Sequence, residues 1–167
     1  LIEGLYKEFS YLNNTLVSVE EYESEGFDNL IFRKIYKTYK EMKAEFGKID
    51  FDDMLYLTFN LFKENPLILQ KWQKRFEFFL IDEMQDMNDI QFEIIKMLAK
   101  TKNIFAVGDD DQSIYGFRGA NPEIMQRFPV VYPECRKIIL SKNYRSNKAI
   151  VDASSFLINS NEMRFSK

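Results

Sequence analysis

Two adjacent carboxylates at the end of an apolar run are the first candidates for chemistry in this sequence. The apolar residues 78–81 lead directly into Asp82 and Glu83, and Gln85 and Asp86 follow. An apolar run with a polar end is typical of a buried parallel strand, and ligands of open α/β sheets bind at the carboxyl ends of such strands. Because successive strand residues point to opposite faces, one carboxylate can hold a divalent cation while the other orients a nucleophile. The alternative is a plain acidic turn before a helix, where carboxylates stabilise exposed N–H groups.

Two more polar clusters follow segments that have strand character. Asn103–Val107 runs into Gly-Asp-Asp-Asp-Gln-Ser-Ile-Tyr-Gly-Phe-Arg-Gly-Ala at 108–120, and Lys137–Leu140 is followed by Asn-Tyr-Arg-Ser at 143–146. The carboxyl ends of parallel strands lie along one edge of a sheet, so we expect all three clusters to meet there. Hydrolysis of a nucleoside triphosphate needs a cation, a carboxylate that orients water, a neutral contact to the γ-phosphate and a positive charge. The three clusters contain carboxylates that could bind a cation and orient water, a neutral glutamine and a positively charged arginine.

Helical signals fill the segments before and between these strands. Asp50 and Asp53 have the spacing of a capping box, and Asn65-Pro66 ends the helix that they begin. A strand, a helix and a second strand over residues 78–107 form a βαβ unit, which is right-handed in nearly all cases. The helices are expected at 29–46, 50–65, 67–75, 88–100 and 123–128, with a connector at 129–133 and a last helix capped by Ser146. Three helices have predicted buried stripes: Ile31, Ile35, Tyr39, Met42 and Phe46; Phe51, Met54, Leu55, Thr58 and Phe62; and Ile150, Val151, Ser154, Leu157 and Ile158.

Composition excludes several classes of protein. The chain of 167 residues is 46% hydrophobic, which is typical of a globular protein, and it contains no histidine, which rules out histidine triads and histidine metal sites. Cys135 is the only cysteine, so an internal disulfide or zinc cluster is excluded and a reducing, cytoplasmic compartment is expected. The net charge of −3 means that any nucleic-acid surface must be local, and no apolar run predicts a membrane partner. The first residue is Leu rather than Met, which suggests a piece of a longer protein.

The three polar clusters resemble motifs II, III and IV of superfamily 1 DNA helicases of the UvrD/Rep/PcrA type. Asp-Glu-Met-Gln-Asp at 82–86, the cluster at 108–120 and Asn-Tyr-Arg-Ser at 143–146 occur in the order of the family. Asp-Phe-Asp-Asp-Met-Leu at 50–55 also resembles a short stretch that precedes motif II. The resemblance implies an α/β chain with a partial RecA-like (P-loop NTPase) three-layer fold and parallel strands. Residues 1–48 would be a helical segment from subdomain 1B, and residues 49–167 would be the part of subdomain 1A that carries the three motifs.

The resemblance implies a role for each nucleotide-site residue. Asp82 would hold Mg²⁺, and Glu83 would contribute to the metal site and deprotonate the attacking water. Gln112 and Arg145 would contact the γ-phosphate of ATP, and Arg145 would also stabilise charge in the transition state. Tyr144 would stack on the adenine of ATP. Gln85 would also belong to the nucleotide site and would link it to neighbouring loops.

The resemblance also implies a DNA track along Tyr115, Phe117 and Arg118, with the aromatic rings stacked on bases of single-stranded DNA. Phe117 stands where many relatives have Trp. Each aromatic residue has a plainer interpretation as a core side chain, Arg145 as a partner of a structural carboxylate, and Asp109–Asp111 as caps of a turn. A nuclease with carboxylate-bound metal is disfavoured because it would leave Gln112 and Arg145 unexplained.

Two functions follow as hypotheses. In the first, the chain belongs to a 3′-to-5′ helicase that acts in DNA repair or replication, uses ATP and Mg²⁺, and unwinds DNA at junctions of single and double strands. No G-x-x-x-x-G-K-[ST] sequence occurs in the 167 residues, so the P-loop segment and the second RecA-like domain would come from the rest of that protein, and this chain alone would be inactive. In the second, the chain is a non-catalytic module, derived from a helicase, that binds nucleic acid or protein.

Overall fold

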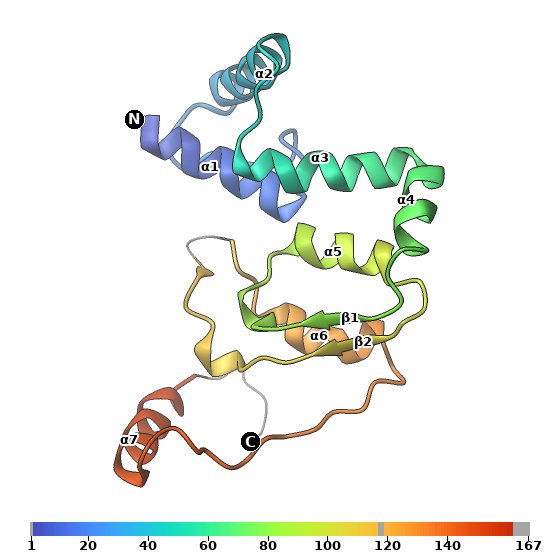
Figure 1. The fold of residues 1–167 in the computed structure, drawn as a ribbon. Helices are drawn as coiled ribbons and strands as arrows, with labels where there is room; N and C mark the ends of the chain where they lie inside the picture. The colour runs from blue at the N-terminus through green and yellow to red at the C-terminus, as the bar shows by residue number, and fades with distance from the viewer. Residues whose placement is uncertain (1, 117–118, 162–167) are drawn as a thin grey trace.

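The computed structural model describes residues 2–116 and 119–161, which form helices around a small parallel sheet (Figure 1). The α-helices are α1 (Ile2–Thr15), α2 (Asn29–Glu45), α3 (Phe51–Glu64), α4 (Pro66–Gln73), α5 (Asp89–Leu98), α6 (Glu123–Val131) and α7 (Lys148–Ile158). The strands are β1 (Phe79–Ile81) and β2 (Ile104–Ala106), and each is followed by a short 3₁₀ helix, η1 (Met84–Asp86) or η2 (Asp110–Gln112). Within the described ranges, no helix is both long enough and apolar enough to cross a bilayer.

The sheet brings two of the three predicted strand ends to one edge. β1 pairs in parallel with β2, with Phe79 opposite Ile104 and Ile81 opposite Ala106. Met84 N–H donates to Val107 O at 3.0 Å, which continues the pairing past the end of β1. The prediction of a βαβ unit across residues 78–107 is therefore confirmed, because α5 connects these parallel strands.

The prediction of a third strand at 137–140 is wrong for this structure. The segment is extended and its side chains are exposed, but the sheet of the described residues contains only β1 and β2. Figure 1 shows this segment crossing below β2 without joining it. An apolar run favours a strand locally, but a strand forms only where a neighbouring backbone supplies hydrogen bonds.

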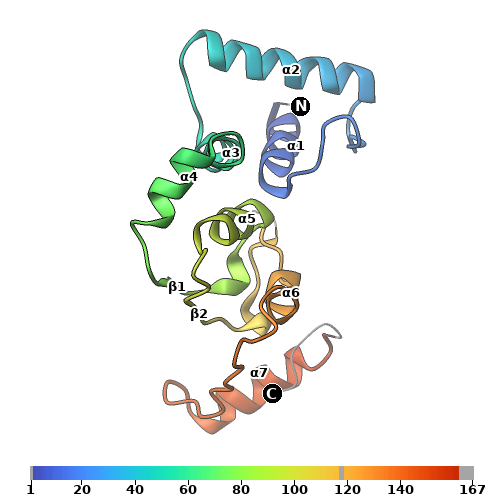
Figure 2. The same cartoon turned by 90° about the vertical axis from the view of Figure 1, so that its right-hand side faces the viewer.

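One face of the sheet is covered and the other is open. Ile81 and Ala106 pack against a core cluster built from η1, α5 and α6, whose buried members are Met84, Met87, Phe92 and Ile124. Figure 2 shows α5 and α6 flanking the strands. On the opposite face, Leu80 is 79% exposed and Phe105 is 61% exposed. Two large apolar side chains in water are unusual for a sheet face and mark a surface that another element can cover.

The first two helices form a separate aromatic cluster. Phe9 and Leu12 of α1 pack against Phe32 of α2, and Tyr36 and Tyr39 lie against the same cluster. The helix predicted at 29–46 is confirmed, but its predicted buried stripe is wrong except for Tyr39. The helix buries the Phe32–Tyr36–Tyr39 face because the aromatic rings of α1 lie there, and Ile31, Ile35, Met42 and Phe46 are exposed.

α3 lies beside α1, and both helices pack against α5 (Figure 2). Phe62 is buried with Ile90 and Ile94 of α5, and Leu55 packs against them, which confirms part of the predicted stripe. Phe51 and Met54 are exposed, contrary to prediction. The reason is that Asp53, which is only 2% exposed, occupies the inward position in the first turn of the helix.

Lys43 of α2 joins α2 to the start of α3 through two carboxylates. Its Nζ lies 2.6 Å from Asp50 Oδ2 and 2.6 Å from Asp53 Oδ2, and the predicted capping box between these aspartates is present. Tyr39 donates its hydroxyl to Asp50 Oδ2 at 2.7 Å, and Lys40 Nζ lies 3.4 Å from Asp53 Oδ1. Burial alone would raise the pKa of Asp50, but hydrogen bonds from Lys43 and Tyr39 lower it to about 2. The Asp50 carboxyl group is therefore ionised at neutral pH, and its charge holds α2 to the start of α3.

Two C-terminal helices differ from prediction. α6 continues through Pro129 to Val131, where a connector was predicted, and Phe128 and Tyr132 hold this end of the helix against the core. α7 is capped by Asn147, whose side chain accepts from Ile150 N–H at 3.1 Å, rather than by Ser146. None of the residues of α7 is buried, so its predicted stripe is wrong, and Figures 1 and 2 show α7 standing away from the sheet.

Candidate functional site

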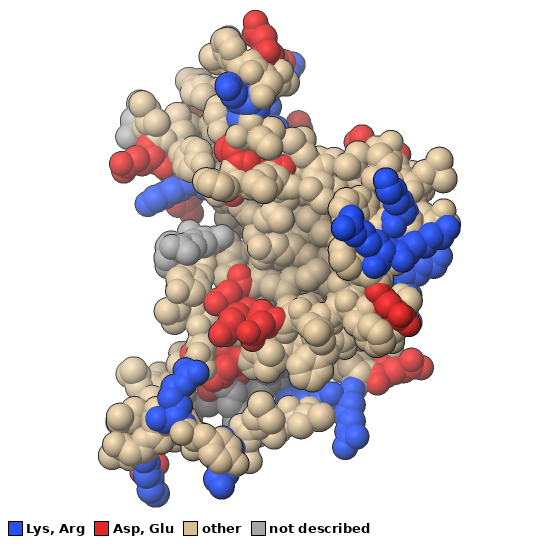
Figure 3. Space-filling view, in the orientation of Figure 1, with Lys and Arg blue, Asp and Glu red and all other residues tan. Residues whose placement is uncertain are grey.

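Asp82 and Glu83 stand at the carboxyl end of β1, where the chain turns sharply. Both side chains are exposed, and Glu83 N–H donates to Asp82 Oδ1 at 2.9 Å. Glu83 has φ 50° and ψ 46°, a left-handed conformation that costs free energy for a residue with a side chain. This turn starts η1 directly and separates the two carboxylates from the buried part of the strand. Figure 3 shows carboxylates gathered on this side of the molecule.

Gln85 connects this carboxylate pair to the end of β2. The residue is only 2% exposed, and both ends of its side-chain amide are bound. Its Nε2 donates to Glu83 Oε2 at 2.7 Å, and its Oε1 accepts from Asp109 N–H at 3.0 Å. Asp109 Oδ2 in turn accepts from Gln112 Nε2 at 2.8 Å. A continuous series of hydrogen bonds therefore runs from Glu83 through Gln85 and Asp109 to Gln112, so the first two polar clusters do meet.

Sequence reasoning did not identify Asp109 as a member of this series. In the sequence, Asp109 was only one residue of the cluster at 108–120 and a possible cap of a turn. The structure shows that Asp109 caps η2, with its Oδ1 accepting from Asp111 N–H at 3.2 Å, while its other oxygen holds Gln112. The capping interpretation of Asp109 is thus confirmed, and the same side chain also orients the predicted γ-phosphate contact.

The close approach of the two strand ends depends on Gly108. A Cβ at this position would lie 2.6 Å from Gln85 Oε1 and 3.1 Å from Met84 N. Since the second atom belongs to the backbone of the paired turn, it cannot move aside alone.

We expect Gly108→Ala to destabilise the protein by about 1–3 kcal/mol, the range typical of overpacking. Chemical denaturation measures this free energy, and hydrogen exchange should be faster in residues 79–86 and 104–112. Gly4→Ala is the matched control, because a Cβ there meets nothing within 4 Å and alanine favours the helix. Equal stability of the two variants would contradict the close packing of these strand ends.

An open groove of about 560 Å³ adjoins the two carboxylates. Asp82, Glu83 and Asp86 form its polar end. The rest of the groove is lined mainly by apolar side chains from α3, β1 and α5, among them Leu55, Leu80 and Ile94. Oxygen ligands at the end of an apolar groove suit a hydrated Mg²⁺, which binds proteins through one or two carboxylates and keeps several waters.

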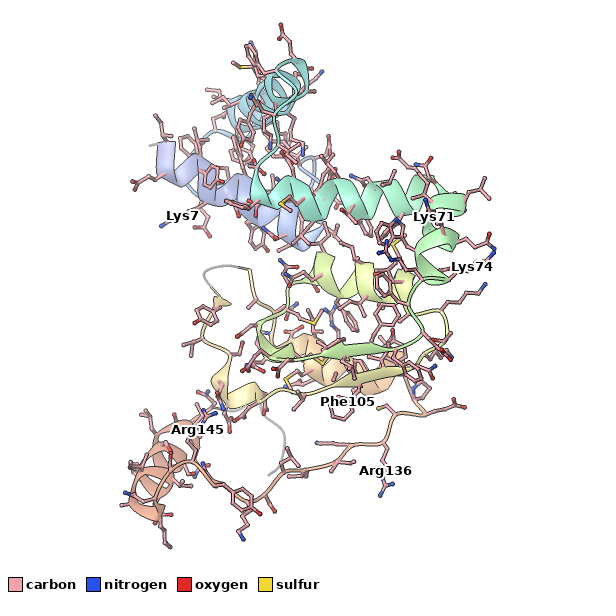
Figure 4. All side chains as sticks on the ribbon, viewed as in Figure 1. Lys7, Lys71, Lys74, Phe105, Arg136 and Arg145 are labelled. Carbon is pink, nitrogen blue, oxygen red and sulfur yellow. The ribbon has the colours of Figure 1, made fainter. Side chains whose placement is uncertain are left out.

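The third polar cluster lies on the segment that leads into α7. Asn143 Oδ1 accepts from the N–H groups of Arg145 and Ser146, both at 2.9 Å, and shapes a turn. Tyr144 is 84% exposed, and Lys142 Nζ lies 4.9 Å from its ring centroid. The plainer interpretation of Tyr144 as a core aromatic is therefore wrong. Figure 4 shows Arg145 near the η2 end of the molecule, on the side where the strands end.

The predicted DNA track is only partly described. Tyr115 is 37% exposed and its carbonyl accepts from Ala120 N–H at 3.3 Å, which closes a turn over residues 115–120. Gly119 has φ 84° in this turn, and its N–H donates to Gly116 O at 2.9 Å. Phe117 and Arg118 lie outside the described residues.

Comparison with known proteins gives the chain its family. A model of the UvrD/REP helicase N-terminal domain matches residues 4–133. A putative ATP-dependent DNA helicase, YjcD of Bacillus subtilis (strain 168), is 38% identical over 165 residues, which are 98% of this chain and 21% of that protein. The ATP-dependent DNA helicase PcrA of Leuconostoc citreum is 38% identical over 162 residues, 95% of this chain and 22% of the relative. A probable DNA helicase II homolog of Mycoplasma capricolum subsp. capricolum is 40% identical over 134 residues, 80% of this chain and 19% of its own length.

The chain thus spans about a fifth of the length of these relatives. The match covers α1 to α6, including both strand ends and the hydrogen bonds between them. The chain belongs to the UvrD/REP helicase family, and most of it is the N-terminal helicase domain of that family.

Proposed function

We propose that this chain is the part of an ATP-dependent DNA helicase that joins its nucleotide site to its DNA track. The observation that carries the proposal is the series of hydrogen bonds from Glu83 through Gln85 and Asp109 to Gln112. Such a series places a carboxylate suited to water activation and a neutral amide suited to the γ-phosphate in one rigid unit. Relatives named as ATP-dependent DNA helicases support the same activity for the intact protein.

In this proposal, Asp82 and Glu83 are the residues that would hold a hydrated Mg²⁺, which would supply positive charge to neutralise the phosphates. Glu83 orients the attacking water and accepts its proton. Gln85 fixes the Glu83 carboxylate through the 2.7 Å hydrogen bond, which also leaves the other carboxylate oxygen to face the water. In the structure, both ends of the Gln85 amide are bound to protein groups. A direct contact of Gln85 with the nucleotide stays a prediction.

The remaining roles concern the γ-phosphate, the adenine and DNA. Gln112 contacts the γ-phosphate. When that phosphate leaves, Gln112 moves, and its hydrogen bond to Asp109 transmits this movement to the turn at 115–120. Arg145 stabilises charge on the transferring phosphoryl group, and the exposed ring of Tyr144 stacks on adenine. Tyr115, Phe117 and Arg118 follow single-stranded DNA, and stepping toward the 5′ end opens the duplex at a junction during repair or replication.

The complete site requires segments outside this chain. We propose that a P-loop segment joins this small sheet and that the complete three-layer RecA-like fold covers the open face marked by Leu80 and Phe105. A second RecA-like domain supplies the other wall of the nucleotide site. Residues 1–48 act as part of subdomain 1B, and residues 49–167 as part of subdomain 1A. By itself, this chain is expected to be a non-catalytic module with weak, salt-sensitive affinity for single-stranded DNA.

The test compares the full-length protein with this chain alone in an ATPase assay with Mg²⁺. We expect single-stranded DNA to stimulate the full-length protein by about tenfold or more, and the 167-residue chain to show no turnover with or without DNA. ATP hydrolysis by the full-length protein that does not respond to DNA would refute the helicase, and no hydrolysis at all would refute the helicase and favour the non-catalytic module. Turnover by the isolated chain would refute the need for the missing segments.

A further inference from the structure

Asn14, in the last turn of α1, has a buried side chain at a point where the starts of α3 and α5 and the turn after motif III approach one another. Its side chain is 6% exposed, although it belongs to a helix whose exposed residues face water on the other side. Buried amides are stable only when their donors and acceptor are satisfied, so the partners of Asn14 show what it holds.

The first two segments are the starts of α3 and α5. Asn14 Nδ2 donates to Asp52 Oδ1 at 2.9 Å and to Ser10 O at 2.8 Å, and Asn14 Oδ1 accepts from Asn88 Nδ2 at 2.7 Å. Asn88 is the N-cap of α5 and also accepts from Gln91 N–H at 2.9 Å. Asn88 is the second residue after motif II, which ends at Asp86. Asn14 therefore holds the point where the turn that carries Asp82 and Glu83 leads into α5.

The third segment is the turn that follows motif III. A Cβ on Gly119 would lie 3.4 Å from Asn14 Cβ, so the backbone of this turn rests directly on the asparagine. Tyr115 is held in the same turn through the bond from Ala120 N–H. On its far side, Asn121 N–H donates to Met87 O at 2.8 Å, which ties the turn to the end of η1.

We infer that Asn14 is a positioning residue that couples the nucleotide turn at 82–88 to the DNA turn at 115–120. This inference rests on the proposed function. The amide holds Asn88, and the Cβ of the same side chain lies beside Gly119, so displacement of either turn changes the surroundings of the same buried residue. Its loss leaves the Asn88 amide and the Asp52 carboxylate without this partner, and the connection between the two turns is weakened to the remaining hydrogen bonds, among them Asn121 N–H to Met87 O.

The test measures the ATPase of the full-length protein carrying Asn14→Ala across a range of single-stranded DNA concentrations. The basal rate and the KM for ATP should remain within about twofold of wild type, whereas the DNA concentration for half-maximal stimulation should rise by about tenfold or more. Asn13→Ala is the matched control. Asn13 is also buried and on the same helix turn, but its Oδ1 accepts from Tyr36 O–H at 2.9 Å and faces α2. A merely structural role predicts the same response from both variants.

A reciprocal exchange adds a second arm that does not depend on the stability of the alanine variant. Asn14→Asp places a second carboxylate against that of Asp52 and should impair DNA stimulation. Adding Asp52→Asn restores a hydrogen bond between positions 14 and 52 and keeps an acceptor for Asn88, so stimulation should recover to within about threefold of wild type.

The outcomes separate the inference from the proposed function. A wild-type protein without DNA-stimulated turnover refutes both. A stimulated wild type whose Asn14→Ala and Asn13→Ala variants respond equally to DNA refutes the coupling alone, as does failure of the exchange to restore stimulation.

Discussion

Glu83→Gln in the full-length protein is expected to reduce ATP turnover by about 10²- to 10⁴-fold, the usual contribution of a general base. The substitution keeps the size of the side chain and retains an oxygen that can accept from Gln85 Nε2, as Glu83 does at 2.7 Å. It removes the negative charge that accepts a proton from water. Because Asp82 and Gln112 are unchanged, the affinity for ATP should stay within about threefold of wild type.

Steady-state ATPase and equilibrium nucleotide binding measure the two quantities separately. Glu93→Gln is the matched control, since Glu93 is a partly exposed carboxylate on α5 that pairs with Lys96 Nζ at 2.7 Å, away from the strand ends. Its turnover should be unchanged. Turnover above about a tenth of wild type in Glu83→Gln would remove Glu83 from the role of base.

Lys43→Met is expected to have the largest effect on stability. The substitution leaves the carboxylates of Asp50 and Asp53 without the ammonium group that lies 2.6 Å from each. Asp53 is 2% exposed, so its charge cannot be hydrated without opening the joint between α2 and α3. Removing one partner of a buried ion pair typically costs about 3–5 kcal/mol.

Hydrogen exchange of the full-length protein measures this change locally. Amides in residues 29–64 should exchange about 10²- to 4 × 10³-fold faster in Lys43→Met, the ratio that corresponds to that free energy. Lys37→Met is the matched control on the same helix, because Lys37 pairs with Glu41 across 3.8 Å with both side chains well exposed. Such pairs contribute little, so its exchange should match wild type. Equal exchange in both variants would show that the Lys43 joint is not required for stability.

Local signals predicted the helix starts at residues 29, 51 and 89 and the two paired strands, but not the end of α6 or the cap of α7. The Asp50–Asp53 capping box was readable from sequence because both partners lie within one helix turn. The pairing of β1 with β2 followed from a βαβ unit whose connection is short. In contrast, the failure of residues 137–140 to form a strand depends on a neighbouring strand, which no pattern inside the segment reveals.

The buried faces of helices were predicted less well, for a physical reason. α2 buries Phe32 rather than Ile31 because its partner α1 presents Phe9, whose ring packs against those of Phe32 and Tyr36, and each such pair contributes about 0.5–1.5 kcal/mol beyond area burial. α7 has an apolar pattern, but no residue of it is buried. Periodicity shows that a face is suited to burial, whereas the tertiary neighbours decide which face is buried.

The site shows the same division. The sequence motifs pointed to Asp82, Glu83 and Gln112, because the expected role of each depends mainly on its type of side chain. They did not show that Gln85 would be buried between two strand ends, or that Asp109 and Asn14 would hold them in place, since these contacts join residues that are 24 and 74 positions apart.

A crystal structure of the full-length protein with Mg²⁺ and a non-hydrolysable ATP analogue is the most direct measurement of the central claim. The account predicts the ion beside Asp82 and Glu83, with Gln112 and Arg145 in contact with the γ-phosphate and the Gln85 bridge between the two strand ends intact. A nucleotide bound away from the ends of β1 and β2, or Gln112 and Arg145 turned away from its phosphates, would contradict the account.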